Sequence, residues 1–153
     1  RQMCIRDSYI IDHHQFHTRQ EFELDMIKIL DKYKPDLVVL AGFMRVLSNI
    51  FVSKYVGKLI NIHPSLLPKY KGLETHKQVI ENNDKFHGVT VHFVDNTLDG
   101  GPICAQSSIR VQTEDIEELE EEIHELEYKI YPKVINEIAE GKIFLSNGKI
   151  IKK

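Results

Sequence analysis

Hydrophobic residues recur along this chain every three or four positions in some stretches and every two in others. From Phe22 to Tyr33 the apolar residues return at helical spacing, which predicts a helix with one buried face. The preceding Thr18-Arg19-Gln20-Glu21 stretch is typical of a capping box, whose Thr and Glu side chains bind free backbone donors at a helix start. We therefore expect a helix that ends before Pro35, preceded at residues 9–11 by the end of a strand.

Two apolar runs predict neighbouring strands. Residues 37–41 are continuously apolar and rich in β-branched side chains, as expected of a strand buried on both faces of a parallel sheet. A short helix that Ser48 can cap follows and ends near Tyr55, and residues 58–62 predict the next strand. Strand, helix and strand in this order indicate βαβ organisation.

The stretch from 87 to 94 alternates with the period of a strand. The alternation places Val91 and Phe93 on one face, and Thr90 and His92 on the other. A helix is predicted at 75–82, where a second capping-box sequence occurs, and a strand at 103–111. An acidic amphipathic helix is predicted from 113, with a kink or restart at Pro132 and an end by 141. A hairpin is predicted at 143–151 around Asn147-Gly148, and we expect it to add an antiparallel edge.

Composition narrows the class of protein. The 153 residues are 42% hydrophobic and 28% charged, which is ordinary for a single globular domain. A net charge of -3 without a basic cluster gives no reason to expect nucleic acid as a partner, and no apolar run is long enough to span a membrane. Two cysteines make no disulfide framework, which favours a reducing, cytoplasmic location.

Histidines near the start of the chain raise the question of a metal. His13, His14 and His17 lie close together in sequence, but no carboxylate or thiolate is spaced to complete a zinc-like set. We therefore expect no metal.

Residues 61–68 are the first candidate for a functional site. Asn61 and His63 end the predicted strand and point to the same face, so that an amide donor and an imidazole reach one reacting atom. This pair suits acyl transfer, in which charge develops on a carbonyl oxygen. His92 on its strand and Asp99 before Gly100 are the next candidates. Each also has a plain structural alternative as a packed, backbone-binding or turn residue.

A resemblance to a known family favours the functional alternative. The string NIHPSLLPKYKGLETH at 61–76 resembles the signature of the folate-dependent formyltransferases, most closely the branch that acts on glycinamide ribonucleotide. Residues 40–45 (LAGFMR), 91–94 (VHFV) and 98–102 (LDGGP) match the same family in the same order.

The resemblance implies a fold and a reaction. The fold is an α/β, Rossmann-like three-layer formyltransferase fold with a mostly parallel central sheet. The reaction transfers the formyl group of 10-formyltetrahydrofolate, a cosubstrate, to the amine of glycinamide ribonucleotide in purine biosynthesis. It needs no metal, the partners are these small molecules, and a homodimer is left open.

The resemblance also implies roles for individual residues. Asn61 donates a hydrogen bond to the formyl oxygen, His63 is the proton donor, and Asp99 holds His63 and an ordered water and shuttles the amine proton. His92 and Glu127 contact the ribonucleotide substrate. The residues implied in folate binding are Arg19, Met44, Arg45, Val46, Leu47, Asn61, Asp95, Asn96, Thr97, Leu98 and Asp99. Arg19 as a first-turn helix residue and Glu127 as part of an acidic helix face remain open alternatives.

The start of the chain departs from the family. Residues 1–8 have no clear period and are predicted to be a non-native junction, with a single formyltransferase domain at 9–153. The Gly- and Ser-rich loop with which the family binds the substrate phosphate does not occur before Tyr9. We therefore expect the first strand-loop-helix units to be missing, poor ribonucleotide binding, and exposed sheet edges that favour aggregation.

Three other functions remain alternatives. Methionyl-tRNA formyltransferase shares the Asn/His/Asp arrangement but normally carries a further carboxy-terminal domain and a basic surface. Formyltetrahydrofolate deformylase has a different loop around the positions of Pro64 and residues 73–76. A non-catalytic folate-binding remnant is the third.

Overall fold

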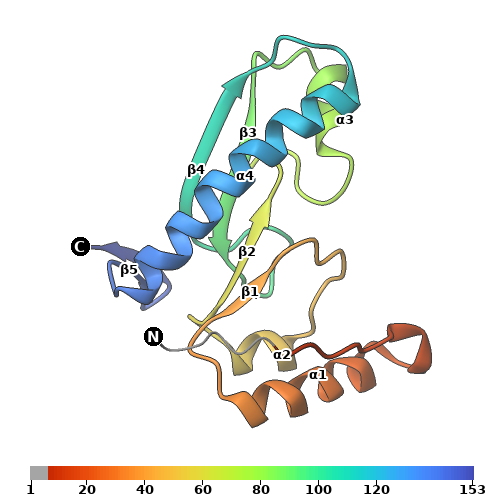
Figure 1. The fold of residues 1–153 in the computed structure, drawn as a ribbon, viewed down its shortest axis with the longest axis vertical. Coiled ribbons are helices and arrows are strands. Elements are labelled where there is room, and N and C mark those ends of the chain that lie inside the picture. The colour runs from red at the N-terminus through yellow and green to blue at the C-terminus, as the bar shows by residue number, and fades with distance from the viewer. Residues whose placement is uncertain (1–6) are drawn as a thin grey trace. The chain divides into compact units, whose positions relative to one another are not determined.

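The computed structural model describes residues 7–153, which form two compact units that divide at Pro35. Each unit is described by itself. Most of the predicted junction at 1–8 lies outside the described residues. The elements are η1 (His13–Gln15), α1 (Arg19–Tyr33), β1 (Val38–Leu40), α2 (Asn49–Lys54), β2 (Leu59–His63), α3 (Thr75–Glu81), β3 (Phe86–Phe93), β4 (Ile103–Arg110), α4 (Ile116–Ala139), β5 (Ile143–Ser146) and β6 (Lys149–Lys152) (Figure 1).

The first unit contains the predicted capped helix. Thr18 is the N-cap of α1, its hydroxyl accepts from the Glu21 amide, and the Glu21 carboxylate accepts from the Thr18 amide. The capping box is therefore confirmed. The expected strand end at residues 9–11 is wrong, because no strand lies among residues 7–35 to pair with it. The Tyr9 hydroxyl instead shares a hydrogen bond with the Tyr33 hydroxyl.

The second unit is built on a four-stranded sheet in the order β1-β2-β3-β4. β1 and β2 are parallel, and β3 is antiparallel to both β2 and β4. The expectation of a mostly parallel sheet thus holds for β1 and β2 only. A parallel pair needs a crossover of a dozen or more residues, and the loop at 94–102 is too short for one between β3 and β4. β1 is an edge strand of this sheet with Val39 40% exposed, so the expected burial on both faces is not found.

Alternation along β2 and β3 separates an apolar face from a polar face. The apolar face carries Ile60, Ile62 and Phe93, which pack with side chains of α4 in one core cluster. Figure 1 shows α4 running along β3 and β4. Burial of each large apolar side chain contributes roughly 1.5–3 kcal/mol. The polar face is therefore left to carry the site.

The connection into α3 differs from the prediction. Glu74, not Thr75, is the N-cap, in the left-handed conformation with φ 57°, and it makes no side-chain capping bond. The Gln78 side-chain amide donates to the Leu73 carbonyl instead of completing a capping box. The buried Thr75 hydroxyl has no hydrogen-bond partner within residues 7–153. The tight turn that follows Gly72, with φ 81°, places Thr75 inside the first turn, where it cannot cap.

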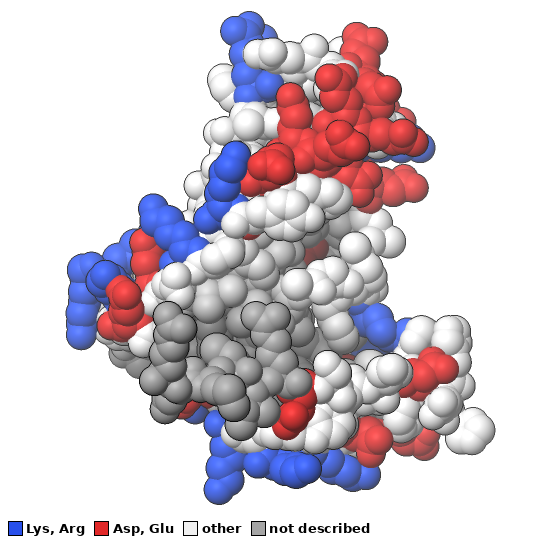
Figure 2. Space-filling view, viewed as in Figure 1, with Lys and Arg blue, Asp and Glu red and all other residues white. Residues whose placement is uncertain are grey.

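α4 has the predicted acidic face. Asp115 caps it by accepting from two backbone amides, and Figure 2 shows Asp and Glu side chains gathered over its amino-terminal half. The helix continues through Pro132, so it does not restart there, whereas the alternative of a kink at Pro132 stays a prediction. Pro132 is exposed. Because proline has no N–H, the carbonyl of Tyr128 lacks its helical donor, and Tyr128 is itself exposed on the side that water reaches.

The carboxy-terminal hairpin forms as predicted, but it does not join the central sheet. Asn147 and Gly148 both have positive φ, 49° and 73°, as a two-residue hairpin turn requires. β5 and β6 pair only with each other, so the expected extra edge on the central sheet is wrong. Ile143 of β5 is buried in the core cluster that α4 shares, which holds the hairpin there. Among the described helices, none has the length and apolarity to cross a membrane.

Candidate active site

The polar face of β2 and β3 collects the predicted strand residues. In the antiparallel register Asn61 pairs with His92, and His63 pairs with Thr90. Directly paired residues and residues two apart in a strand share a face. His63 and His92 are only 5% and 2% exposed, whereas Asn61 is half-buried. The sheet therefore presents one amide and two buried imidazoles side by side.

The loop after β3 brings Asp99 to the same face. One Asp99 carboxylate oxygen, Oδ2, lies 3.6 Å from His63 Nδ1, and the other, Oδ1, lies 3.9 Å from His92 Nε2. Both distances exceed a hydrogen bond. A Cβ on Gly101 would lie 1.9 Å from the Phe93 carbonyl oxygen, so only glycine lets the loop return this closely. Asp99 itself has a positive φ of 44°, a strained conformation typical of functional sites.

The hydrogen bonds of His63 define its tautomer. Its Nε2 lies 2.8 Å from the Tyr70 carbonyl oxygen. A carbonyl only accepts, so Nε2 carries the hydrogen. In the neutral imidazole the lone pair is then on Nδ1, the atom that faces Asp99. Nδ1 is thus the atom of His63 that takes up or releases a proton.

His92 is held in the opposite tautomer. Its Nδ1 donates to the Phe93 carbonyl at 2.9 Å, so Nε2 is an acceptor. Burial lowers the pKa of His92, although the hydrogen bond to Phe93 and the charge of Asp99 oppose this effect, and the ring is neutral near pH 7. The buried Nε2 has no hydrogen-bond partner among residues 7–153.

The site therefore gathers three acceptors that do not satisfy one another. They are His63 Nδ1, His92 Nε2 and the Asp99 carboxylate. A small group with several hydrogens, such as an amine or a water, can donate to acceptors 3.9 Å apart at the same time. With the Asn61 amide as a nearby donor, the arrangement suits deprotonation of a nucleophile and stabilisation of an oxyanion.

The predicted folate-binding segments border this site. Residues 44–47 follow β1, whose last residue Leu40 pairs with Asn61. Met44 is 75% exposed and Leu98 is 51% exposed, so both offer apolar surface. In the loop that contains Asn96, the Asp95 carboxylate accepts from the Thr97 amide and hydroxyl. Contacts of Met44, Arg45, Val46, Leu47 and residues 95–99 with folate stay predictions.

Glu127 and Arg19 differ in how the structure places them. Glu127 lies on α4, half-buried. Burial raises its pKa, and the charges of His124 and His63 oppose that rise. Arg19 belongs to the first unit, where its Nε lies 3.9 Å from a Glu23 carboxylate oxygen. The substrate contact of Glu127 and the folate contact of Arg19 stay predictions.

Sequence reasoning missed two residues that contact the catalytic candidates. The Tyr70 carbonyl accepts from His63, and the Gly72 amide donates to Asp99 at 2.8 Å. Both contacts use backbone atoms, which have no signature in residue type. The one available signal was that these residues lie inside the string that resembles the family signature.

A possible set of metal ligands lies in the first unit. Asp12, His13 and His14 place ligand atoms within 4.8 Å of one another, and all three are exposed. Asp12 is a carboxylate next to the histidines, so the expectation that no carboxylate is spaced to join them is wrong. Asp12 already accepts from the His14 amide as the cap of η1. The expectation of a protein without metal stays a prediction.

The chain is similar in sequence and in fold to known proteins. The chain is 50% identical to the phosphoribosylglycinamide formyltransferase of Escherichia coli over 129 residues, which are 84% of this chain and 61% of that protein. A solved structure of the phosphoribosylglycinamide formyltransferase from Coxiella burnetii matches with a TM-score of 0.88 at 44% identity and covers 94% of this chain and 68% of its own. The glycinamide ribonucleotide transformylase 1 structure from Symbiobacterium toebii matches with a TM-score of 0.87 at 35% identity. This match covers 92% of this chain and 67% of the solved chain.

The matched lengths are unequal. The chain spans about three fifths of the length of the Escherichia coli relative. The sequence pattern of the formyl transferase family matches residues 6–135, which include β1 to β4 and most of α4. Because this match covers most of the chain and contains Asn61, His63 and Asp99, the chain belongs to the formyl transferase family.

Proposed function

We propose that this chain carries the catalytic part of an enzyme that transfers the formyl group of 10-formyltetrahydrofolate to the amine of glycinamide ribonucleotide. The observation that carries the proposal is the meeting of three acceptors, His63 Nδ1, His92 Nε2 and the Asp99 carboxylate, of which His92 Nε2 is buried without a partner among residues 7–153. An amine nucleophile is the group these acceptors lack. The relatives named phosphoribosylglycinamide formyltransferase support the choice of substrates.

The proposed reaction begins with the amine. The neutral amine donates to His92 Nε2 and to the Asp99 carboxylate, which orients its lone pair toward the formyl carbon. As the new C–N bond forms, the formyl C=O becomes an oxyanion that accepts from the Asn61 amide. One well-placed donor of this kind contributes roughly 3 kcal/mol of transition-state stabilisation.

The proton then moves from the attacking nitrogen to the leaving nitrogen. His63 Nδ1 receives a proton while its Nε2–H stays bound to the Tyr70 carbonyl. The resulting imidazolium faces Asp99, whose negative charge stabilises it. Release of this proton to the folate nitrogen accompanies cleavage of the old C–N bond and regenerates neutral His63. No metal or covalent intermediate with the chain takes part in the proposal.

The remaining contacts complete the proposal. Residues 44–47 and 95–99 bind the pteridine, Arg19 lies near the benzoyl-glutamate end, and Glu127 with His92 contacts the ribonucleotide. The exposed apolar side chains of Met44 and Leu98 support the first of these assignments. A cytoplasmic location and a homodimer stay predictions.

Hydrolysis of the same cosubstrate is the second candidate, because a water satisfies the three acceptors as well as an amine does. A water attacking in place of the amine releases formate, which is the reaction of formyltetrahydrofolate deformylase. The loop sequence around Pro64 and residues 73–76, which resembles that of the transferases, and the relatives named for formyl transfer favour the amine.

The test measures both products of 10-formyltetrahydrofolate with the purified chain. At ribonucleotide concentrations high enough to offset the expected poor binding, we expect formylated glycinamide ribonucleotide, and little formate when the ribonucleotide is absent. The matched variants Asn61→Ala and His63→Ala should each lower transfer by about 10²–10³-fold. Equal formate release with and without the ribonucleotide would select hydrolysis. Cosubstrate binding without either product, even after a family-type amino-terminal segment is added to the chain, would select a folate-binding remnant.

A further inference from the structure

Residues 69–72 form a loop that contacts both proton-transfer groups of the site. The Tyr70 carbonyl accepts from His63 Nε2, and the Gly72 amide donates to Asp99 Oδ2. The tautomer of His63 depends on the first contact, because that carbonyl is the acceptor that keeps the hydrogen on Nε2. Whatever holds Tyr70 in place therefore also sets which nitrogen of His63 faces Asp99.

Tyr70 does not reach this position by its own conformational preference. Its φ is 52°, in the left-handed region, which is unfavourable for a bulky side chain. Such a conformation persists only where surrounding contacts impose it. The Tyr70 hydroxyl supplies one such contact, because it donates to Asp84 Oδ2 at 2.8 Å.

Asp84 binds the loop from the far side. Besides the Tyr70 hydroxyl, its carboxylate accepts from Lys69 Nζ at 2.9 and 3.0 Å. These hydrogen bonds, first that of Lys69 and then that of Tyr70, lower the pKa of Asp84, so the carboxylate is ionised at neutral pH. Asp84 thus touches two consecutive residues of the loop and neither catalytic group itself.

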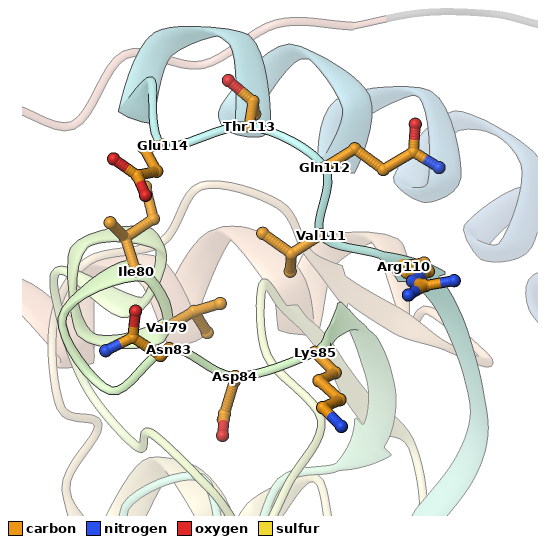
Figure 3. A pocket seen from close by; sticks show the side chains of 10 residues that line it. All are labelled: Val79, Ile80, Asn83, Asp84, Lys85, Arg110, Val111, Gln112, Thr113 and Glu114. Carbon is orange, nitrogen blue, oxygen red and sulfur yellow. The ribbon is translucent and has the colours of Figure 1, made fainter.

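The backbone of Asp84 is itself fixed. Its amide donates to the Val79 carbonyl at the end of α3, and β3 begins at Phe86. Asp84 is one of the residues that line an open pocket of about 300 Å³. Thr113 and Glu114 line the opposite wall, and the Asp84 carboxylate points away from them (Figure 3). The side chain is therefore directed to the loop rather than to the pocket.

We propose that Asp84 is a positioning residue that holds the Tyr70 carbonyl against His63 and so fixes the catalytic tautomer of this histidine. The consequence for catalysis rests on the proposed formyl transfer, whereas the consequence for the tautomer does not. The Tyr70 contact carries the effect, because the Lys69 ammonium is largely exposed, with 62% of its side chain accessible, and exposed ion pairs contribute little.

The chain offers variants that separate the contacts. Asp84→Ala removes both, Tyr70→Phe removes only the hydroxyl, and Lys69→Met removes only the ammonium. Asp84→Asn keeps an acceptor for the Tyr70 hydroxyl without the charge, so it serves as the conservative rescue.

The experiment reads the tautomer directly by ¹⁵N NMR of the histidine rings at pH 8, with His63 signals assigned by their loss in His63→Gln. We expect the Nε2–H form in the full chain, in Lys69→Met and in Asp84→Asn, and a mixture of both tautomers in Asp84→Ala and Tyr70→Phe. An unchanged His63 spectrum in Tyr70→Phe would overturn the proposal, even if Asp84→Ala fails to fold.

Activity gives a second readout. In Asp84→Ala and Tyr70→Phe we expect kcat for formyl transfer to fall about tenfold, in proportion to the lost fraction of the competent tautomer, with KM for the folate little changed. A shift in KM alone with kcat intact would contradict the positioning role. If neither the unmodified chain nor any variant transfers the formyl group, the proposed function fails. The NMR result still decides the role of Asp84 in that case.

Discussion

The two faces of the central sheet divide stability and chemistry between them. Ile60, Ile62 and Phe93 on one face are buried against α4 and have no polar atom in their side chains. Asn61, His63 and His92 alternate with them on the other face and include a buried nitrogen that has no partner within residues 7–153. Burial on the first face lowers the free energy of the fold, whereas burial on the second leaves His92 Nε2 as an acceptor that a bound group can satisfy. Neighbouring residues of one strand thus serve opposite purposes.

The strongest way to test this division is to remove a large side chain from the apolar face. Phe93→Ala should lower the free energy of unfolding by about 4 kcal/mol, because Phe93 is 1% exposed and its loss leaves a cavity. Urea unfolding followed by circular dichroism measures this. Asn61→Ala is the matched change on the paired strand, and a loss of similar size there would contradict the separation of the two faces.

A smaller effect tests whether the polar face also carries some stability. The buried Thr90 hydroxyl donates to the Ser65 carbonyl and accepts from the Leu67 backbone amide and the Gln106 side-chain amide. Thr90→Val keeps the shape but leaves these groups unpaired, so the free energy of unfolding should fall by about 2 kcal/mol. Thr90→Ser keeps the hydroxyl and should retain most of the free energy of unfolding. Equal stability of the Val and Ser variants would show that the hydroxyl does not stabilise the fold.

A pH experiment sharpens the comparison for the histidines. Burial, followed by the charge of His76, lowers the pKa of His87 from an ordinary 6.5 to about 4, and burial lowers the pKa of His76, whose Nδ1 lies 3.0 Å from His87 Nε2. Between pH 6.5 and 4 the unfolded chain binds more protons than the folded one, so stability is complete above pH 6.5 and falls as the pH drops.

The size of this loss is measured by urea unfolding at pH 7.5 and 5. We expect the buried His87 to account for about 1 kcal/mol of the decrease, discounted for solvent screening. His87→Gln should unfold with a correspondingly weaker pH dependence. The same slope in this variant would assign the effect to other groups, such as His92, whose pKa burial also lowers.

The smallest expected change is at His92. His92→Phe removes the hydrogen bond to the Phe93 carbonyl and also the buried nitrogen without a partner. These effects oppose each other, so the free energy of unfolding should stay within about 1 kcal/mol of the unmodified chain. Under the proposed function, KM for the amine substrate should nevertheless rise severalfold. A large loss of stability would mean that His92 is a core residue rather than a ligand-binding one.

Local sequence patterns were sufficient where a structure depends on near neighbours. The Thr18 and Glu21 capping box, the left-handed Asn147-Gly148 turn and the alternation that separates His92 from Phe93 all form as predicted. Each involves residues only a few positions apart, for which backbone geometry alone decides the contact.

Patterns failed where the structure around a segment overrides its local preference. The Thr75 capping sequence is displaced by the preceding turn, and α4 passes through Pro132 on its exposed side. The 143–151 hairpin forms a sheet of its own, because Ile143 packs in the core cluster that α4 shares.

For the candidate site, the sequence determined the chemical groups and the tertiary structure decided their arrangement. The types and order of Asn61, His63 and Asp99 were sufficient to suggest acyl transfer, since side-chain chemistry is encoded residue by residue, and the resemblance of the surrounding segments to a known family narrowed this to formyl transfer. The distance from His63 to Asp99 and the tie from Asp84 through Tyr70 join segments that are remote in the chain, partly through backbone atoms. Such contacts arise only when the strands and loops fold together, because a backbone carbonyl is the same in every residue.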